Sequence, residues 1–252
     1  MERHPNLGYF CLFIGCPKSG HSLVGSLLDA HPNIIIAHEQ DVIKCLQRGV
    51  NRDFILFLLL GNSRHYARTG REWRGYSYFV PNQWNGRCRD LHVIGDKKGS
   101  ATVKRLSQYP ALLETLKREI PLDLKFIHVI RNPFDTISTA SKNKNLTLDR
   151  CIDKLLYKYK AAAELKKRIN ENDIFELCHE EFIKNPRYWL EKLCRFLGQD
   201  TPPGYLEDCA GIVNPVPHQS RFEVTWSSAR IRVVEKEIKK YSFLEGYTYE
   251  SG

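Results

Sequence analysis

The sequence predicts an α/β fold in which a parallel β-sheet is covered by helices on both faces. Short apolar runs typical of buried strands alternate with stretches of helical periodicity, and turns rich in glycine or charge follow the runs. The length of 252 residues suits one sizeable domain. We expect that domain to span residues 1–252, with an insertion or lid at residues 65–90.

The first strand is predicted at residues 9–14, before a turn at residues 15–20 and a helical pattern that ends before Pro32. Backbone N–H groups of such a turn, together with the helix dipole, favour a bound oxyanion. Lys18 adds a full charge, and Ser19 and Ser22 add hydroxyl donors. The stretch therefore predicts a phosphate or sulfate site, although an ordinary strand-to-helix turn explains it equally well when it is taken alone.

The second strand is predicted at residues 33–37, where β-branched residues are concentrated. Its end is followed by Glu39, and open parallel sheets bind ligands at the carboxyl ends of their strands. Glu39 is therefore a candidate general base. The alternative is an acidic residue at the start of the next helix, where the helix dipole favours it.

A strongly apolar helix is predicted at residues 51–64, and the segment at residues 65–90 then mixes arginines, aromatic residues and glycines without a clear period. We interpret this segment either as a lid that lines an acceptor pocket or as an irregular packed surface loop. A third strand at residues 91–95 precedes Lys97 and Lys98, of which one reaches the first turn or both are solvated. A helix at about residues 101–119 is expected to break near Pro110.

The clearest central strand is predicted at residues 125–130. Asn132 and Pro133 suit the cap and first position of a new helix, which places an arginine at the strand end and two hydroxyls two turns into the helix. An arginine with nearby hydroxyls suits a second phosphate. The residues proposed for it are Arg131, Ser138 and Thr139.

The rest of the chain predicts a helix from Thr147, a last strand at residues 174–177, a helix at residues 186–197 and a final amphipathic helix near residues 231–241. Because parallel strands end at the same edge of a sheet, we expect four residues to converge there. They are Lys18, Glu39, Lys97 and Arg131.

Composition narrows the possible partners. A net charge of +9 favours an anionic ligand, but no interleaved basic and aromatic motif indicates nucleic acid. The eight cysteines form no C-x-x-C pair and no metal-finger spacing, so no metal is expected. No signal peptide is visible, and the longest apolar run, residues 54–60, is too short to span a bilayer. A cytoplasmic location is the expectation, and the oligomeric state stays open.

Two motifs resemble those of the sulfotransferase superfamily, whose sulfuryl donor is 3′-phosphoadenosine 5′-phosphosulfate (PAPS). Residues 17–23 resemble its 5′-phosphosulfate loop, Pro-[Lys/Arg]-[Ser/Thr]-Gly-[Thr/Ser]-[Thr/Ser]. Arg131-Asn132-Pro133, with Thr139 eight residues after the arginine, resembles its 3′-phosphate motif. The resemblance covers nearly the whole chain, is closest to compact bacterial sulfotransferases, extends to tyrosylprotein sulfotransferases in the first third, and implies a parallel sheet like that of P-loop NTPases.

The resemblance implies a role for each matching residue. Lys18 would bind the 5′-phosphate and the sulfuryl group, and Arg131 and Thr139 would bind the 3′-phosphate. Glu39 matches the base of the tyrosylprotein branch, and Lys97 matches its second lysine, with Lys98 as an alternative because the register is loose. The loop would be completed by Pro17, Ser19, Gly20, His21 and Ser22.

The chain departs from the family pattern at two places. His21 stands where a hydroxyl residue is usual, and the glycine-rich C-terminal motif for the 3′-phosphate in the small-molecule branch is missing, so Arg221 is proposed as its substitute. That branch uses a histidine base between its two motifs, whereas the comparable stretch here carries Lys97 and Lys98. Glu39 is therefore the preferred base.

The implied reaction moves a sulfuryl group from PAPS to a hydroxyl or amine of a small-molecule or polymer acceptor, without a metal. One alternative is a nucleotide-dependent phosphotransferase, but the chain lacks the Gly-x-x-x-x-Gly-Lys-[Ser/Thr] pattern because Lys18 precedes Gly20. The other is a cofactor-binding module of the same fold without turnover, which the unusual His21 allows.

Overall fold

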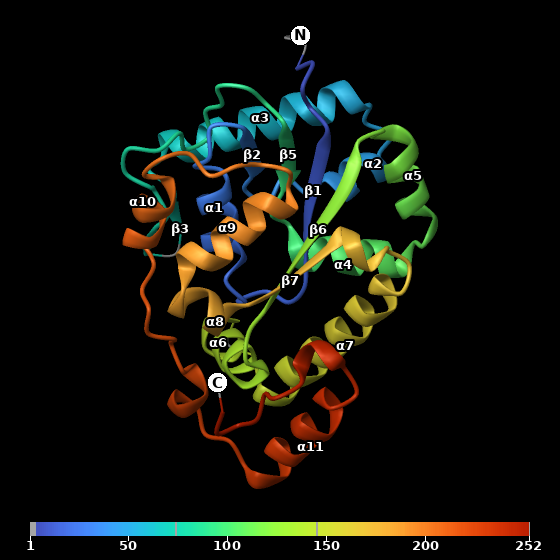
Figure 1. The fold of residues 1–252 in the computed structure, drawn as a ribbon. Helices are drawn as coiled ribbons and strands as arrows, with labels where there is room; N and C mark the ends of the chain where they lie inside the picture. Colours follow the sequence, from blue (N-terminus) through green and yellow to red (C-terminus); the bar gives the residue numbers. More distant parts are fainter. Residues whose placement is uncertain (1–3, 74, 145, 252) are drawn as a thin grey trace.

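The computed structural model describes residues 4–73, 75–144 and 146–251. At its centre is a five-stranded parallel sheet with the order β2-β5-β1-β6-β7 (Figure 1). The predicted parallel sheet is confirmed, and each strand lies close to its predicted range. The strands are β1 (Tyr9–Ile14), β2 (Ile34–Ala37), β5 (Val93–Asp96), β6 (Asp123–Ile130) and β7 (Ile174–Cys178).

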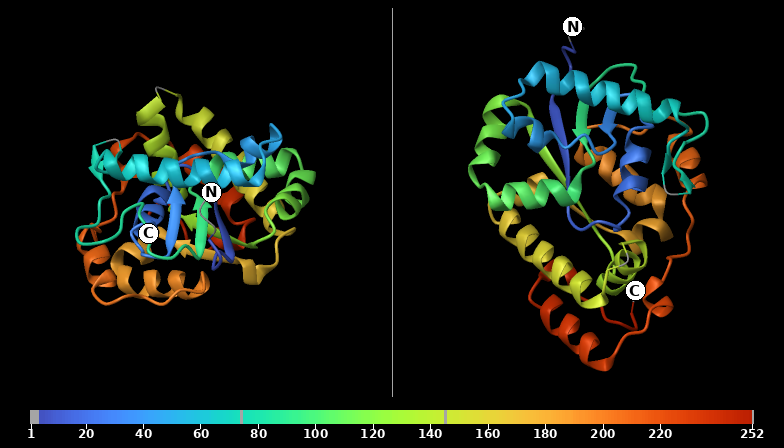
Figure 2. Two further views of the ribbon diagram at one scale, coloured as in Figure 1. Left: turned by 90° about the horizontal axis from the view of Figure 1, so that it is seen from above. Right: turned by 180° about the vertical axis from the view of Figure 1, so that it is seen from behind.

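Helices cover both faces of this sheet, as predicted (Figure 2). Successive strand side chains point to opposite faces, so β1 sends Phe10, Leu12 and Ile14 into one core and Cys11 and Phe13 into the other. The first core lies under α2 (Val42–Gln47), α3 (Arg52–Arg68), α4 (Gly99–Gln108), α5 (Ala111–Glu119) and α7 (Leu148–Lys166). The second lies under α1 (His21–Leu28), α8 (His179–Lys184), α9 (Pro186–Phe196) and α10 (Tyr205–Gly211).

A third cluster of buried side chains lies beyond the carboxyl ends of the strands. It joins α6 (Pro133–Lys144), one side of α7 and α11 (Ser228–Ile238). Figure 1 shows α6, α11 and the C-terminus at the end of the molecule opposite to the N-terminus. The C-terminal part of the chain therefore lies on the same side of the sheet as the predicted site.

Several helices begin where a side chain caps the first turn. Asn51 and Thr147 accept hydrogen bonds from backbone N–H groups three residues on, and Asn132 Oδ1 accepts one from Phe134. The predicted break at Pro110 separates α4 from α5. The short helices α8 and α10 were not predicted, because six or seven residues show too little periodicity to be recognised.

The segment at residues 65–90 begins as the last turn of α3, which extends four residues beyond its predicted end, and continues into a small antiparallel hairpin. The hairpin is formed by β3 (Glu72–Trp73) and β4 (Tyr76–Ser77). Arg71, just before it, is buried and forms an ion pair with the equally buried Asp29 at the end of α1. Backbone hydrogen bonds from Trp84 and Gly86 to the same end of α1 also hold the segment in place.

Candidate active site

The loop between β1 and α1 is shaped by left-handed backbone conformations. Gly15 has φ 121°, Lys18 has φ 71° and Gly20, which precedes α1, has φ 97°. The first N–H groups of a helix have no partner within it, so the start of α1 presents unpaired donors. A loop with this curvature at a helix N-terminus suits a bound oxyanion.

Two histidines pack directly under the glycines of this loop. A Cβ on Gly20 would lie 2.5 Å from His179 Nδ1, and one on Gly15 would lie 2.9 Å from His128 Cδ2. Both positions therefore require glycine. Burial, followed by the nearby charge of Arg131, lowers the pKa of His179 to about 4, so its imidazole is neutral near pH 7.

The side chain of His21 is turned into the core. Its Nε2 lies 3.0 Å from the carbonyl oxygen of Ile14, and its ring packs edge-on against Phe13 and over Gly99. Burial lowers its pKa to about 4. Because the neutral imidazole of His21 bonds to the end of β1, the group that His21 can offer to an anion is its backbone N–H.

The second cluster joins the first turn of α1 to the ends of β2 and β5. Lys97 Nζ donates to Ser22 Oγ at 2.9 Å and to Glu39 Oε1 at 3.2 Å, and Lys98 Nζ donates to Glu39 Oε2 at 2.7 Å. Lys97 is 3% exposed and Glu39 is 35% exposed. Both lysines therefore reach Glu39, and Lys97 also reaches the loop.

Burial raises the pKa of Glu39, but the charges of Lys97 and Lys98 and their hydrogen bonds outweigh it and lower the pKa to about 2. Burial in turn lowers the pKa of Lys97, against the opposing attraction of Glu39. The carboxylate is thus fully ionised at neutral pH, and its negative charge is shared by two ammonium groups.

Glu39 is held in an unusual backbone conformation. Its φ is 61° and that of Asp41 is 63°, both in the left-handed region that non-glycine residues seldom occupy. Asp96, fully buried at the end of β5, accepts hydrogen bonds from the backbone N–H groups of Gln40 and Val42, each at 3.0 Å. Asp96 therefore fixes the strained turn that presents Glu39, and Glu39 lies before α2 and not inside it.

The third part of the site lies at the end of β6. Arg131 Nη1 donates to the carbonyl oxygen of Lys18 at 3.1 Å, and Nη2 donates to that of His218. The guanidinium thus connects the loop to the C-terminal part of the chain. Thr139 Oγ1 lies 2.8 Å from Ser220 Oγ, whereas the buried Ser138 accepts a hydrogen bond from Trp226 Nε1 at 3.0 Å.

Arg221 is completely buried, and within the described residues its ion pair is with α6 and not with the loop. It binds Asp135 of α6 twice: its backbone N–H donates to Oδ1 at 2.9 Å and its Nη1 donates to Oδ2 at 2.6 Å. Arg221 therefore attaches the 3-10 helix η2 (Ser220–Glu223) to α6. This attachment brings the neighbouring Ser220 to Thr139. Arg221 Nε and Nη2 are buried and have no hydrogen-bond partner among the described residues, so the assignment of Arg221 to the 3′-phosphate site stays a prediction.

Two residues of the site escaped the sequence analysis. His179 and Glu180 follow β7, and Glu180 accepts hydrogen bonds from the backbone N–H of Asn132 at 2.8 Å and from Tyr247 at 2.7 Å. Glu180 thus braces the turn that carries Arg131. Both residues directly follow a predicted strand, so the rule that identified Glu39 could have identified them as well.

A narrow recess lies beside Lys97, and it has no room for a water molecule. Arg71 from the 65–90 segment and Tyr66 from the end of α3 form its far wall, and His38 stacks on Tyr66 with ring centroids 3.9 Å apart. The recess is bounded by Ser22, Gly25, Ser26, Ile36, Ala37, His38, Tyr66, Arg71 and Lys97.

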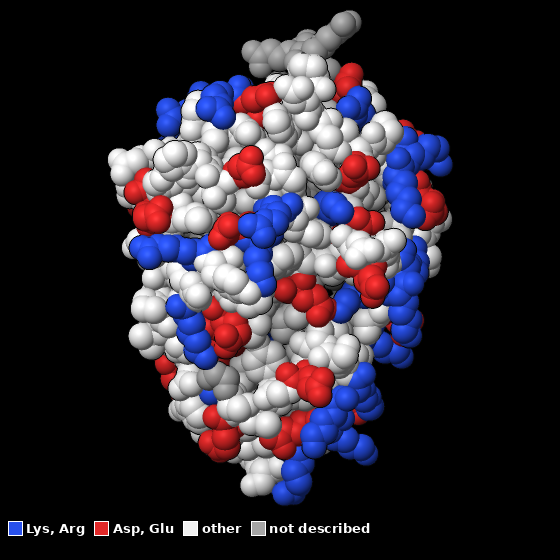
Figure 3. Space-filling model, in the orientation of Figure 1, with Lys and Arg blue, Asp and Glu red and all other residues white. Residues whose placement is uncertain are grey.

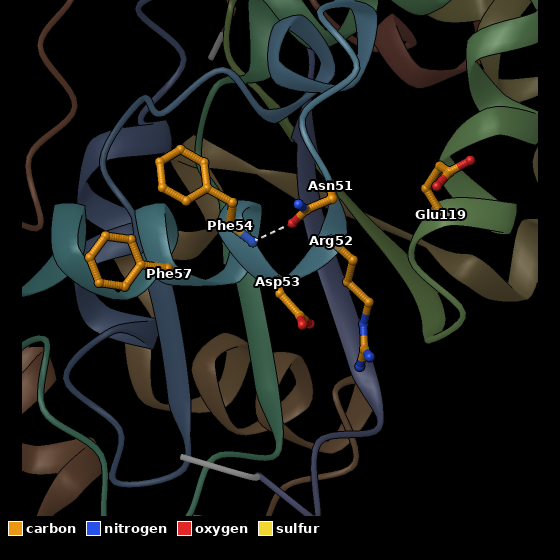
Figure 4. Close-up of a pocket in the computed structure, with 6 residues that line it drawn as sticks. All are labelled: Asn51, Arg52, Asp53, Phe54, Phe57 and Glu119. Atoms are coloured by element: carbon orange, nitrogen blue, oxygen red, sulfur yellow. Dashed lines mark hydrogen bonds between the residues drawn. The ribbon is translucent and has the colours of Figure 1, made fainter. Parts of the chain in front are cut away.

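A larger surface hollow, of about 740 Å³, lies at the other end of α3 (Figure 4). Phe54 and Phe57 lie on one side of it, and Glu119 at the end of α5 lies on the other. At ~1.5 Å per helical residue, Phe54 is about 18 Å along the helix from Tyr66. This hollow includes none of the predicted site residues.

The charge of the surface is dispersed. On the face shown in Figure 3, Lys and Arg side chains are spread among Asp and Glu and do not form one broad basic patch. In the part of the chain that the structure describes, no three His, Cys, Asp or Glu residues are grouped to hold a metal ion. None of the helices formed by residues 4–73, 75–144 and 146–251 is both long and apolar enough to cross a membrane.

The ion pairs of Glu39 predict a pH dependence of stability. The pKa of Glu39 is lowered from 4.5 to about 2 in the folded protein, so its ionised form stabilises the fold above pH 4.5 and this contribution is lost as the pH falls toward 2. In thermal denaturation over that interval, Glu39→Gln should show a shallower fall in melting temperature than the unmodified protein. Glu171→Gln, at an exposed position before β7, serves as the control. Equal slopes for Glu39→Gln and the unmodified protein would contradict the pairing.

Comparisons with known proteins agree with the fold. A family model described as the sulfotransferase family matches residues 12–203. The sulfotransferase domain of the olefin synthase from Synechococcus PCC 7002 is 13% identical, with 95% of this chain and 98% of that chain covered and a TM-score of 0.61. Sulfotransferase STF9 from Mycobacterium avium is 12% identical over 98% of this chain and 79% of that chain, with a TM-score of 0.53. A sulfotransferase from Alicyclobacillus acidocaldarius is 15% identical over 95% and 94% of the two chains, with a TM-score of 0.50. Among curated proteins, none matches the sequence significantly.

Proposed function

The chain belongs to the sulfotransferase family, and on that premise we propose that it transfers the sulfuryl group of PAPS to a hydroxyl, or an amine, of an acceptor. The observation that carries the proposal is the position of Lys97, which bonds to Ser22 of the loop and to Glu39. In sulfuryl transfer, negative charge develops close to the group that removes the proton of the acceptor. A cation between an anion-binding loop and a carboxylate base would stabilise that charge.

The residues present fit such a donor. The 5′-phosphosulfate would bind to the N–H groups of the loop and to Lys18, and the 3′-phosphate to Arg131 and Thr139. Arg131 donates hydrogen bonds from its two Nη groups to the carbonyl oxygens of Lys18 and His218. Phosphate oxygens would replace these carbonyl oxygens as acceptors. When bound, the donor supplies the activated sulfuryl group.

Catalysis would depend on positioning and charge. By analogy with phosphoryl transfer, an in-line displacement with a loose transition state needs little covalent participation by the protein. Glu39 accepts the proton of the acceptor hydroxyl as the new O–S bond forms and the S–O bond to the 5′-phosphate breaks. Lys18 and Lys97 stabilise the negative charge that develops on the leaving phosphate and the sulfuryl oxygens.

The resting ion pairs also regulate the base. A carboxylate held by Lys97 and Lys98 is a weak base, because both ammonium charges lower its pKa. Sulfuryl oxygens that take over the N–H groups of Lys97 would withdraw that attraction and raise the pKa of Glu39. In this proposal Glu39 becomes an effective base only when the donor is in place.

We place the reacting group of the acceptor beside Lys97 and Glu39. The recess there is too narrow for a water molecule, so the side chains that line it would have to move apart to admit any part of the acceptor. The stacked rings of His38 and Tyr66 and the guanidinium of Arg71 offer apolar and polar walls. In this way the 65–90 segment contributes to the acceptor side of the site.

The direct test is transfer of label from ³⁵S-labelled PAPS to a panel of phenols, aliphatic alcohols, sugars and amines. We expect labelled product from at least one class, together with formation of 3′,5′-adenosine bisphosphate, and we expect neither from Lys18→Ala. Release of the bisphosphate nucleotide without labelled product in any class, at a rate that Lys18→Ala does not change, would contradict the proposal.

A further inference from the structure

We propose that α3 is the interface of a symmetric dimer, in which its exposed face packs antiparallel against the same face of a second copy of this chain. In the view from behind in Figure 2, α3 crosses the outside of the molecule in front of the strands. The residues of this face are not among those assigned to the donor or to the base. The inference therefore does not depend on the proposed function.

The first half of the exposed face is apolar. Phe54 and Phe57 are 50% and 58% exposed, and their rings stack with centroids 5.9 Å apart. Leu58 lies beside them and is half-buried. Aromatic side chains are enriched at the centres of protein interfaces, so an exposed pair of this kind suits a contact with another protein.

The middle of the face is Gly61, which has no packing reason within the chain. Glycine is a poor helix former, because it has more conformational freedom to lose than any other residue. A Cβ added to Gly61 would meet no atom of the described residues within 4 Å, so the fold of one copy leaves room for alanine there. A helix position without a side chain lets the backbone of a second helix approach closely.

The second half of the face is basic. Arg64, His65 and Arg68 are exposed there, whereas Asp53 is exposed beside the phenylalanines at the start of the helix. Within the part of the chain that the structure describes, Asp53, Arg64 and Arg68 form no ion pair. The face thus has an acidic and aromatic end and a basic end, both without partners of opposite charge in their own chain.

A twofold axis at Gly61 brings these unlike ends together. Helical residues advance by about 100° and 1.5 Å, so the three apolar residues before Gly61 and the three basic residues after it all point within about 60° of its direction. The axis places a residue before Gly61 opposite the residue of the second copy at the same distance after it. Phe54 then faces Arg68 of the second copy, and Phe57 faces Arg64 of the second copy. A guanidinium over an aromatic ring is a favourable contact, and the symmetry forms each contact twice.

The hollow beside the phenylalanines fits the same arrangement. Its lining carries two carboxylates, of Asp53 and Glu119, against one guanidinium, of Arg52 (Figure 4). A volume of about 740 Å³ admits a long side chain, and the carboxylates suit the guanidinium of Arg68 of the second copy. The same carboxylates would repel an anionic membrane, which is the other surface that exposed phenylalanines near arginines could bind.

The size of the contact sets its expected strength. α3 has 17 residues and is therefore about 25 Å long. One helix from each copy gives a contact at the small end of specific interfaces, so we expect a reversible dimer. A dissociation constant of about 1–100 µM corresponds to a contact of this kind.

The test is sedimentation equilibrium of the full chain over a concentration series. The mass should rise from 29.3 kDa toward twice that value. Arg68→Glu should weaken the dimer about tenfold or more, because it places a second negative charge opposite Asp53. Combining Asp53→Arg with Arg68→Asp restores opposite charges between the copies and should recover most of the affinity. Arg232→Glu, at an exposed position of α11, is the matched control and should leave the affinity unchanged.

Gly61→Gln gives a readout that a purely structural role could not produce. Glutamine is a better helix former than glycine, so the variant should melt at a higher temperature when it is dilute. Its side chain stands at the crossing point, so the same variant should dimerise about tenfold more weakly. The substituted residues are all exposed in one copy, so we expect every variant to fold.

Three results would overturn the proposal. One is a constant mass of 29.3 kDa at concentrations well above the expected dissociation constant, with or without binding of the monomer to anionic phospholipid vesicles. Another is a dimer that both Arg68→Glu and Gly61→Gln leave intact, because a different face would then form it. The third is equal weakening by Arg68→Glu and Arg232→Glu, because net charge alone would then explain the effect.

Discussion

Glu39→Gln is expected to lower turnover by about 10²–10⁴-fold while leaving the affinity for 3′,5′-adenosine bisphosphate unchanged, because it removes a general base and no contact to the nucleotide. Glutamine keeps the size of the side chain and one oxygen that can accept from Lys97 or Lys98, so the turn after β2 should persist. The measurement is the steady-state rate with an acceptor found in the labelled-transfer panel.

A matched control separates loss of the base from a general effect of a lost carboxylate. Glu171→Gln removes an exposed carboxylate far along the chain from the site and should retain full turnover. Near-normal turnover of Glu39→Gln would show that another group removes the proton, and Glu39 would then be reduced to a partner that holds Lys97 in place.

Lys97→Met should lower turnover by about 10²–10³-fold, the usual effect of removing one group that stabilises charge in a transition state. The side chain of Lys97 is 3% exposed and lies between Gly25 and Ser22. Methionine is unbranched and of similar length, so it fits this position, and it avoids the free-energy cost of burying a charge. The effect should appear in kcat more than in nucleotide affinity.

The neighbouring lysine provides the comparison. Lys98 is 31% exposed and contacts Glu39 but has no contact with Ser22 among the hydrogen bonds of the described residues. Lys98→Met should therefore reduce turnover less than tenfold, in the range of one partly exposed ion pair. If Lys98→Met were the more damaging of the two variants, the assignment of the second lysine would have to be reversed.

The site residues that follow the strands could be predicted from the sequence because one rule governs their position. Parallel strands end at a common edge, so polar residues that follow apolar runs must meet there, and Lys97 does lie between the loop and Glu39. The same rule would have included His179 and Glu180 after β7. They were missed because no phosphate-like motif drew attention to that strand.

Other features needed the tertiary structure. Neighbouring residues on a helix point about 100° apart, and only the tertiary structure shows that Ser138 is turned toward Trp226 and Thr139 toward Ser220. The sequence offers Arg221 as a substitute for the missing C-terminal motif, and only the tertiary structure shows its ion pair with Asp135. The inward rotation of His21 likewise depends on the carbonyl oxygen of Ile14 and the space above Gly99.

The most direct measurement of the central claim is a calorimetric titration of the unmodified protein with 3′,5′-adenosine bisphosphate and, separately, with ATP and Mg²⁺. It needs no knowledge of the acceptor. A site built from the loop around Lys18 and from Arg131 should bind the bisphosphate without metal and at least tenfold more tightly than ATP with Mg²⁺, a difference of about 1.4 kcal/mol. Tighter binding of ATP with Mg²⁺, or no binding of the bisphosphate, would contradict the assignment of the site to a PAPS-dependent sulfotransferase.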